Sequence, residues 1–109
     1  MSYKITAIST FLREAKRLGK KYPSLKKEIE ILSNQLKENP LTGTPLGKNC
    51  FKIKLGIASK GKGKSGGARI ITCVIFISRS VYLLSIYDKS ERADVSDKEL
   101  QILLNSFNH

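Results

Sequence analysis

The fold is decided by residues 50–69, which read CFKIKLGIASKGKGKSGGAR. In the first half, lysines alternate with large apolar residues, and such alternation is typical of a half-buried β-strand. A strand is therefore expected over residues 51–58, and its core-facing side chains are Phe51, Ile53, Leu55 and Ile57. Lys52 and Lys54 would share the opposite face. The second half is too rich in glycine and lysine to pack, so residues 59–67 are expected to form a mobile connection.

The chain as a whole is strongly basic. It has 109 residues, a length typical of one domain, and its net charge is +11 with a pI near 9.9. Between residues 39 and 87 there are eight Lys or Arg and no Asp or Glu. Such a balance implies an anionic partner, which could be nucleic acid, a membrane surface or an acidic protein. Because this middle stretch is uniformly basic and the flanking helices carry charges of both signs, we expect a localised binding surface.

Other kinds of chemistry find little support in the composition. Cys50 and Cys73 lack metal-type spacing and are expected to be buried strand thiols, with a disulfide as the alternative. The only histidine is His109, the last residue. One local group of acidic residues comprises Asp88, Glu91 and Asp94. Because basic residues surround this group, it is interpreted as a solvated cluster, and we predict no metal.

The N-terminus does not have the pattern of a signal peptide, and the longest apolar run, residues 70–77, is too short to span a bilayer. A soluble cytoplasmic protein is therefore expected.

The hydrophobic periodicity predicts an α+β domain with the element order β-α-α-β-β-β-α. Strands are expected over residues 2–8, 51–58, 68–77 and 81–87. Helices are expected over residues 10–21, from Ser24 to Asn39, and from Ser96 onward. The first two helices should form an antiparallel hairpin, because only a short turn joins them. Residues 39–49 are rich in proline and glycine and are expected to be a loop, whereas the apolar strand 68–77 should lie at the centre of the sheet.

Apolar stripes and polar caps locate the helices more closely. Ser9 or Thr10 is expected to cap the first helix, Ser24 the second, and Ser96 with Glu99 the third, in a capping box. The core-facing residues of the three helices are Phe11, Leu12, Ala15 and Leu18; Leu25, Ile29, Leu32 and Leu36; and Leu100, Leu103, Leu104 and Phe107.

The paired lysines and Arg69 suggest a function in nucleic-acid binding, although clustered lysines on a strand are often only a solvated face. RNA cleavage is also chemically accessible to such a site. It needs a base at the 2′-hydroxyl, neutralisation of charge on the phosphate, and an acid at the leaving oxygen. Cations that are crowded together disfavour one another's charged form, and this lowers the pKa of a lysine among them. A lysine that acts as a base must first lose its proton, so such crowding would favour this role. Arginine is suited to clamp a phosphate with two hydrogen bonds.

Three segments carry a resemblance to a known family. They are CFKIKL at residues 50–55, GKSGGAR at residues 63–69, and YDKSER at residues 87–92 followed by the Ser96 helix. In this order they resemble the RelE/HigB-like toxins of bacterial type II toxin–antitoxin systems. The resemblance implies a metal-independent, ribosome-dependent endoribonuclease that cuts mRNA in the ribosomal A site and needs no cofactor. It also implies a cognate antitoxin, with helix-turn-helix architecture as one option, that covers the basic surface.

The resemblance also implies roles for individual residues. Lys52 and Lys54 resemble the strand lysines that transfer protons and stabilise charge, Arg69 the arginine that binds the scissile phosphate, and Arg92 a late basic residue of the active-site rim. The expected RNA-binding residues are Lys48, Lys60, Lys62, Lys64, Lys89 and Tyr87. Tyr87 could stack on a base or belong to the core. The chain departs from the RelE pattern at Ser90 and Ser96, where an arginine and a tyrosine would be expected.

Two other functions stay open. A ParE-like toxin would share the fold but poison DNA gyrase instead of cleaving RNA. A protein that only binds nucleic acid or an antitoxin would have the basic surface without the catalysis. The paired strand lysines with Arg69 favour the ribonuclease.

Overall fold

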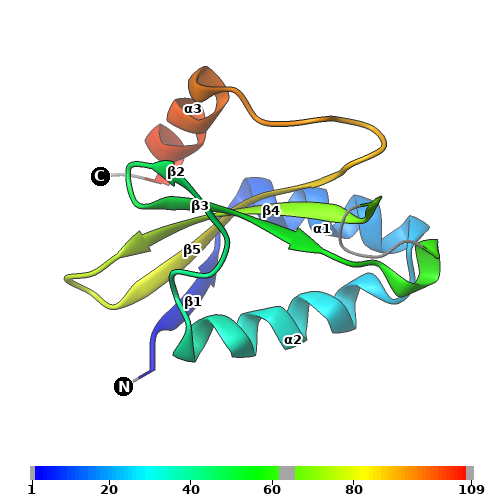
Figure 1. Cartoon of the computed structure of the whole chain (residues 1–109), viewed down its shortest axis with the longest axis horizontal. Helices are drawn as coiled ribbons and strands as arrows, with labels where there is room; N and C mark the ends of the chain where they lie inside the picture. Colours follow the sequence, from blue (N-terminus) through cyan, green and yellow to red (C-terminus); the bar gives the residue numbers. More distant parts are fainter. Residues whose placement is uncertain (1, 62–65, 108–109) are drawn as a thin grey trace.

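A five-stranded sheet with the spatial order β1-β5-β4-β3-β2 forms the middle layer of the molecule (Figure 1). The structure is a computed structural model and describes residues 2–61 and 66–107. The strands are β1 Lys4–Ala7, β2 Thr44–Gly47, β3 Cys50–Leu55, β4 Ala68–Ile75 and β5 Ser80–Asp88. The helices are α1 Ser9–Lys21, α2 Leu25–Glu38, α3 Asp97–Phe107 and the short 3₁₀ helix η1 Ala58–Lys60. Only β1 and β5 pair in parallel; the other neighbours are antiparallel.

The predicted α+β class and the order of its helices are confirmed, and the buried strand β4 is central, as its apolar sequence indicated. The predicted loop over residues 39–49 was wrong in part, because it contains strand β2. Pro45 and Gly47 hid this strand, but proline is tolerated on an edge strand, where its missing N–H leaves no ladder bond unmade. Lys48 and Asn49, with φ values of 56° and 60°, form the tight turn that returns the chain into β3.

Helices α1 and α2 cover one face of the sheet. The core there joins the two helices to inward-facing strand residues, among them Phe11, Leu18, Leu25, Leu32, Leu36, Ile53, Ile70 and Ile86. The core face predicted for residues 51–58 is confirmed, because Ile53 and Ile57 are buried and Phe51 and Leu55 pack against this cluster. Leu12 was wrongly predicted to be in the core: its side chain is 57% exposed.

The predicted cap of α1 was also wrong, whereas the predicted cap of α2 is confirmed in position only. Ile8 occupies the cap position of α1, and Ser9 is already helical. Ser24 does stand at the start of α2, but its hydroxyl makes no capping hydrogen bond and instead contacts Glu28 and Ser59. Tertiary partners compete for such short polar side chains, so the local pattern located the start of α2 but not its capping contact.

Helix α3 packs on the opposite face (Figure 1). Its capping box is confirmed: Ser96 N–H donates to Glu99 Oε1 at 3.0 Å, and Glu99 N–H donates to Ser96 Oγ at 3.1 Å. Leu100 and Leu104 are buried against β3, β4 and β5. Cys50 and Cys73 lie opposite each other in this core, where both are buried, as predicted, and carry free thiols.

Helix α1 also protects the edge of β5. Strand β1 ends at Ala7, which pairs with Leu83, so the second half of β5 has no strand neighbour on that side. Glu14 of α1 accepts hydrogen bonds there from Ser85 Oγ at 2.8 Å and from Ile86 N–H at 3.2 Å. A carboxylate thereby replaces part of the missing ladder and holds the end of β5 in place. That end of β5 carries Tyr87 and Asp88.

Candidate active site

Three strands bring Lys54, Arg69 and Tyr87 into one row across the sheet. Lys54 pairs with Arg69, and Arg69 pairs with Tyr87, so all three side chains project from the face that α3 covers only in part. Val74 N–H donates to Asn49 O, so these two residues are a hydrogen-bonded pair. The two types of pair alternate along an antiparallel ladder, and Lys54 and Arg69 lie five positions further on, so they form a non-hydrogen-bonded pair. In such pairs the Cα atoms lie about 4.5 Å apart, which brings side chains close together. Two cations are therefore held side by side, as the sequence predicted.

The two cations differ in exposure. Lys54 is exposed, whereas Arg69 is 5% exposed and donates from Nη1 to Ala68 O at 3.1 Å. The backbone therefore helps to fix the guanidinium, while the Lys54 ammonium is accessible to a substrate.

Tyr87 lies beneath Arg92. The tyrosine is 4% exposed, and the Arg92 guanidinium carbon lies 5.1 Å from the centre of its ring, a cation–π geometry. Burial, together with the nearby Asp94 carboxylate, raises the pKa of Tyr87 above its ordinary value. Arg92 also donates from Nε to Asp94 O at 3.2 Å and forms an ion pair with Glu99. The ring face that could stack on a base is thus covered by Arg92, and the guanidinium sits at the rim of the row.

Asp94 links this rim to the second strand lysine. Its carboxylate lies 3.1 Å from Lys52 Nζ, and Asp94 Oδ1 also accepts from Val95 N–H at 2.8 Å and from Tyr87 OH at 3.5 Å. The Val95 N–H bond and Lys52 lower the pKa of Asp94. The sequence predicted Asp94 only as part of a solvated cluster, and this role was not predicted. The available signal was its place in the acidic group that follows the acid-free middle of the chain.

A second carboxylate, Asp88, is fully buried at the end of β5. Tyr22 OH donates to it at 2.7 Å, Ser90 donates from Oγ at 2.7 Å and from N–H at 2.9 Å, and Lys60 forms an ion pair with it. Burial alone would raise the pKa of Asp88, but the hydrogen bonds from Lys60, Tyr22 and Ser90 hold it well below the ordinary value. Asp88 is therefore a structural anion, a role that the predicted solvated cluster did not include.

Lys60 consequently anchors η1 to the end of β5. Its side chain is 11% exposed, and the ammonium is held by Asp88 and by Ser90 Oγ at 3.1 Å. Ser59 N–H donates to Ser24 Oγ at 3.0 Å, and Ala58 N–H donates to Glu28 Oε2 at 2.8 Å. The prediction of a mobile connection was therefore wrong for residues 59 and 60, which are tied to α2 and β5. Lys62, Lys64 and His109 lie outside the described residues.

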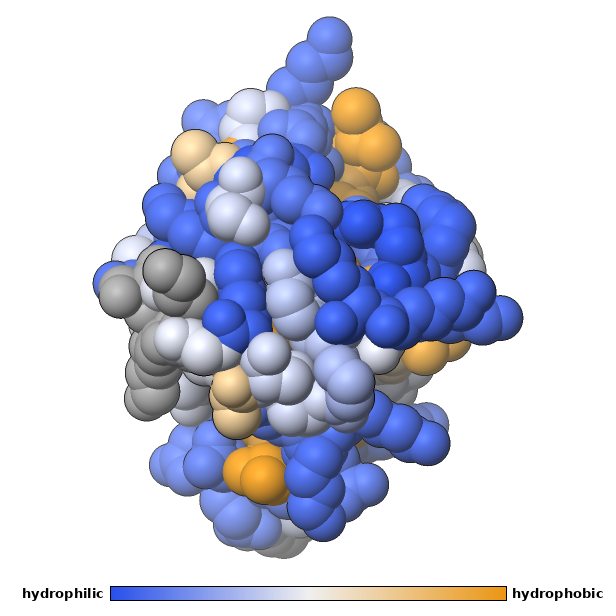
Figure 2. Space-filling view, turned by 90° about the vertical axis from the view of Figure 1, so that its right-hand side faces the viewer, coloured by the Kyte–Doolittle hydropathy of each residue, from blue (hydrophilic) through white to orange (hydrophobic). Residues whose placement is uncertain are grey.

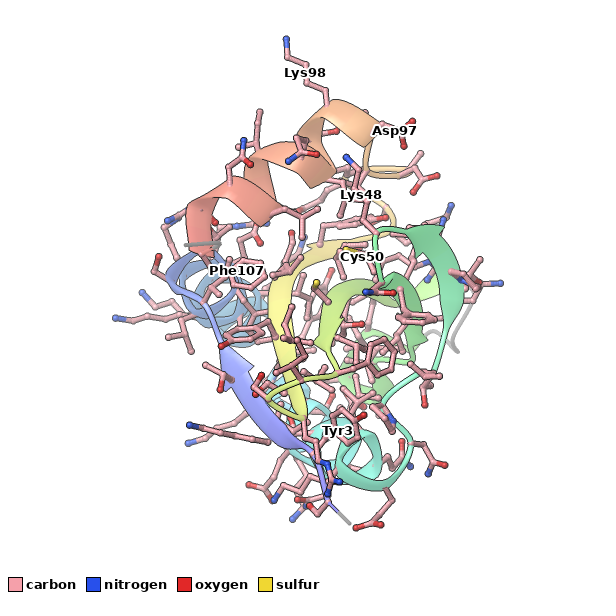
Figure 3. All side chains as sticks on the ribbon, turned by 90° about the vertical axis from the view of Figure 1, so that its left-hand side faces the viewer. Tyr3, Lys48, Cys50, Asp97, Lys98 and Phe107 are labelled. Atoms are coloured by element: carbon pink, nitrogen blue, oxygen red, sulfur yellow. The ribbon has the colours of Figure 1, made fainter. Side chains whose placement is uncertain are left out.

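The remaining predicted RNA-binding lysines in the described part of the chain lie away from the row of Lys54, Arg69 and Tyr87 or form hydrogen bonds within the protein. Lys48 is in the β2–β3 turn and forms a hydrogen bond with Gln101 of α3, so it points toward that helix (Figure 3). From Cys50 to Lys54 the strand runs four residues, about 13 Å at the usual rise, and Lys48 lies beyond its far end. Lys89 donates from its backbone N–H to Gly67 O at 3.0 Å and from Nζ to Ala93 O at 3.5 Å.

A groove of about 410 Å³ runs along the outer edge of β3, beyond the end of β2. Lys52 and Lys54 form part of its lining, together with Gln35 and residues 42–44. Gly43 is required here, because its φ is +110° and an added Cβ would lie 2.6 Å from Lys52 O. The end of the molecule that carries η1 and residues 89–95 presents a largely hydrophilic surface (Figure 2).

Across residues 2–61 and 66–107, no group of three or more His, Cys, Asp or Glu side chains could hold a metal ion. Over the same ranges, no helix is long and apolar enough to cross a membrane.

The fold and this site together define a small basic α+β protein with clustered cations on one sheet face. A comparison with family models matches residues 3–107 to the family described as the RelE toxin of the RelE/RelB toxin–antitoxin system. Because the match spans nearly the whole chain, the protein belongs to the RelE toxin family, as the three sequence segments indicated.

Solved structures agree at the level of the fold. A double arginine-to-alanine mutant of the Escherichia coli toxin RelE in the free state is similar with a TM-score of 0.67 and 19% identity, covering 98% of this chain and 99% of that one. The isolated E. coli RelE toxin gives 0.58 and 21%, covering 97% and 100%. The toxin–antitoxin complex RelBE2 from Mycobacterium tuberculosis gives 0.59 and 20%, covering 86% and 95%.

Proposed function

We propose that this chain is a metal-independent endoribonuclease that cuts mRNA in the ribosomal A site and so arrests translation. The observation that carries the proposal is the row of Lys54, Arg69 and Tyr87, with Lys52 and Arg92 at its rim. A ribonuclease of this kind must hold a phosphate and move two protons, and it acts where its substrate is translated, in the cytoplasm. Membership of the RelE toxin family supports the same assignment.

Each cation has a distinct part in the proposed reaction. Arg69, which is buried and fixed by the Ala68 carbonyl, would bind the scissile phosphate. Lys54 is exposed and has no hydrogen bond or ion pair within the described part of the chain, so it would take the proton of the 2′-hydroxyl. The 2′ oxygen then bonds to phosphorus, and the bond from phosphorus to the 5′ oxygen breaks. Lys52, once released from Asp94, would protonate that leaving oxygen.

The products are a 2′,3′-cyclic phosphate and a 5′-hydroxyl, so the proposed step consumes no water and uses no metal ion. Arg92 would support the phosphate from the rim. The site alone would not position the substrate, because the groove beside β3 is open, and a ribosome that holds the mRNA would provide this orientation. We further propose that a cognate antitoxin binds this chain, as the antitoxin does in the RelBE2 complex.

A reconstituted translation reaction tests the proposal. mRNA ends are mapped by primer extension after incubation with the wild-type chain, Lys54→Ala or Arg69→Ala. Wild-type protein should cut within codons at the A site, and each variant should be slower by about 100-fold or more. Lys98→Ala is the matched control, because Lys98 is exposed and points away from the molecule (Figure 3). Intact mRNA with wild-type protein would refute the nuclease, and gyrase-dependent DNA breaks would then favour the ParE-like activity.

A further inference from the structure

Two buried cysteines face each other across β3 and β4. Cys50 pairs with Cys73, and both lie on the sheet face that packs against α3. The neighbouring pair, Asn49 and Val74, is hydrogen-bonded, so the two cysteines form a non-hydrogen-bonded pair. The Cα atoms of such a pair lie about 4.5 Å apart, and those of a disulfide usually lie about 4.4–6.8 Å apart. The backbone therefore holds the two cysteines within disulfide range.

The two sulfur atoms converge on one point of the backbone. Cys50 Sγ lies 3.5 Å from the carbonyl oxygen of Lys48, and Cys73 Sγ lies 3.9 Å from the same oxygen. Both side chains are buried, with 1% and 3% exposure, in the cluster that includes Leu100 and Leu104 of α3. Figure 3 shows Cys50 close to Lys48 on this side of the molecule. The sequence contains only these two cysteines, so each has one possible partner within the chain.

The two thiols differ in access. A cavity of about 260 Å³ between β4 and α3 has Cys73 in its wall, together with Lys48, Gln101 and Phe107 among other residues. Cys50 does not line this cavity. Hydrogen peroxide is only slightly larger than water, and a water molecule takes up about 30 Å³ in the liquid. The cavity therefore has room for a peroxide beside the Cys73 sulfur.

The contact between the thiols adds a chemical difference. The hydrogen bond from Cys50 lowers the pKa of Cys73, against the opposing effect of burial. The same hydrogen bond, together with burial, raises the pKa of the Cys50 thiol. The thiolate is the form of cysteine that acts as a nucleophile. Cys73 thus combines thiolate character with access to the cavity, whereas Cys50 keeps its proton and is enclosed.

We infer that Cys50 and Cys73 are a redox-modification site, at which a peroxide converts the two thiols into a reversible cross-strand disulfide. The Cys73 sulfur attacks one peroxide oxygen, the O–O bond breaks, and Cys73 becomes a sulfenic acid. The hydroxide that leaves takes up the proton that Cys73 gave up. The Cys50 sulfur then attacks the Cys73 sulfur, the S–O bond breaks, and water leaves with the Cys50 proton. The two sulfurs have then given two electrons to the peroxide, and a dithiol reverses the change.

The disulfide would act on the strand pair that carries the candidate active site. Lys54 and Arg69 project from the same sheet face as the cysteines, four residues further along each strand. The bond would enclose residues 51–72 in a covalent loop, which restricts the unfolded chain and stabilises the fold. In reducing compartments such disulfides are usually transient and redox-sensing, which favours a reversible link over a permanent one. The inference does not depend on the proposed ribonuclease activity.

Peroxide treatment of the reduced, folded chain tests the inference. The intact mass should fall by two hydrogens, proteolysis without reductant should yield a peptide pair that links Cys50 to Cys73, and dithiothreitol should reverse both changes. The unfolding equilibrium constant in urea should be about 100-fold smaller for the oxidised chain than for the reduced one. Cys50→Ala and Cys73→Ala, checked for folding by circular dichroism, are the controls and should show no such difference. Two thiols that stay free in the wild type, or a disulfide between two chains, would overturn the inference.

The order of the two steps has its own test, in which dimedone traps the sulfenic acid. In Cys50→Ala, the trapped product should accumulate at Cys73, because the thiol that would replace it is absent. In Cys73→Ala, trapping at Cys50 should be slower by about tenfold or more, because Cys50 does not line the cavity. Equal rates in the two variants would overturn the assignment of Cys73 as the reactive thiol. A disulfide that forms only after the chain is unfolded in urea would overturn the role of the native strand pairing.

Discussion

Two carboxylates six residues apart each hold one lysine from the basic stretch 50–69, and they do so in opposite environments. Asp88 is fully buried, and its partner Lys60 has a side chain that is 11% exposed. Asp94 has a side chain that is 60% exposed, and its partner Lys52 is 22% exposed. The Asp88 pair is further enclosed by Tyr22 and Ser90.

Burial decides what each ion pair can do. A buried pair cannot be opened without leaving a charge in a poorly hydrated site, so Asp88 and Lys60 act as a permanent structural link. An exposed pair contributes little, because water replaces either partner at small cost. Asp94 can therefore be displaced from Lys52 by a phosphate. Both ion pairs join a lysine to an aspartate. The Lys60–Asp88 pair anchors the start of the glycine–lysine segment, whereas the Lys52–Asp94 pair covers a candidate catalytic lysine.

Asp88→Asn should have the largest effect on stability. The amide leaves the buried Lys60 ammonium without a counter-charge, and removing one partner of a buried pair costs about 3 kcal/mol of unfolding free energy. Urea unfolding at pH 7 measures it. Glu91→Gln is the matched control: it removes the exposed ion pairs with Arg17 and Lys21 and should cost less than about 1 kcal/mol. Equal effects of the two changes would contradict the distinction between buried and exposed pairs.

The contribution of Asp88 should also depend on pH. Its pKa is lower in the folded chain than in the unfolded chain, so its stabilising effect is full above the ordinary carboxylate pKa of about 4 and is lost as pH falls toward the lower, folded value. The difference in unfolding free energy between the wild type and Asp88→Asn should therefore narrow by about 1 kcal/mol between pH 5 and pH 3. Urea unfolding across this range provides the measurement, and a constant gap would contradict the assignment.

Tyr22→Phe should have a smaller effect on the same buried cluster. It removes the 2.7 Å hydrogen bond to Asp88 but keeps the ring and the Lys60 pair. A hydrogen bond to a charged group contributes about 1.5 kcal/mol. Combining Tyr22→Phe with Asp88→Asn gives a double-mutant cycle. The two costs should not add, because the residues share one interaction.

The alternation in β3 and the apolar run of β4 predicted their strands, because side-chain period and burial are local properties of a sheet. The Lys54–Arg69 pairing then followed from a hairpin-like connection between the strands. Strand β2 was missed because its residues are typical of loops and are held in place by β3, a partner that the local pattern does not include.

The ion pairs could not be predicted from local sequence patterns for a similar reason. Lys60 and Asp88 are 28 residues apart, and Lys52 and Asp94 are 42 apart. Charges near the surface have no periodic signature that identifies such partners. The same holds for Leu12, whose helical position is compatible with the core stripe but lies at the groove between α1 and α2. Sequence could therefore predict that Lys54 and Arg69 lie together, but not that Asp94 covers Lys52 at the rim of their row.

The smallest effect is expected for Asp94→Asn, and it should appear in function. The substitution frees Lys52 at a cost in stability below about 1 kcal/mol, since the pair is exposed. If a phosphate must displace Asp94, the variant should bind a short single-stranded RNA up to about fivefold more tightly, which corresponds to the same energy. Fluorescence anisotropy at fixed salt measures the affinity. Asp97→Asn is the matched control, because it removes one negative charge from an exposed position outside the row. An equal gain in both variants would mean that net charge alone governs binding, and no gain in Asp94→Asn would mean that Lys52 does not contact RNA.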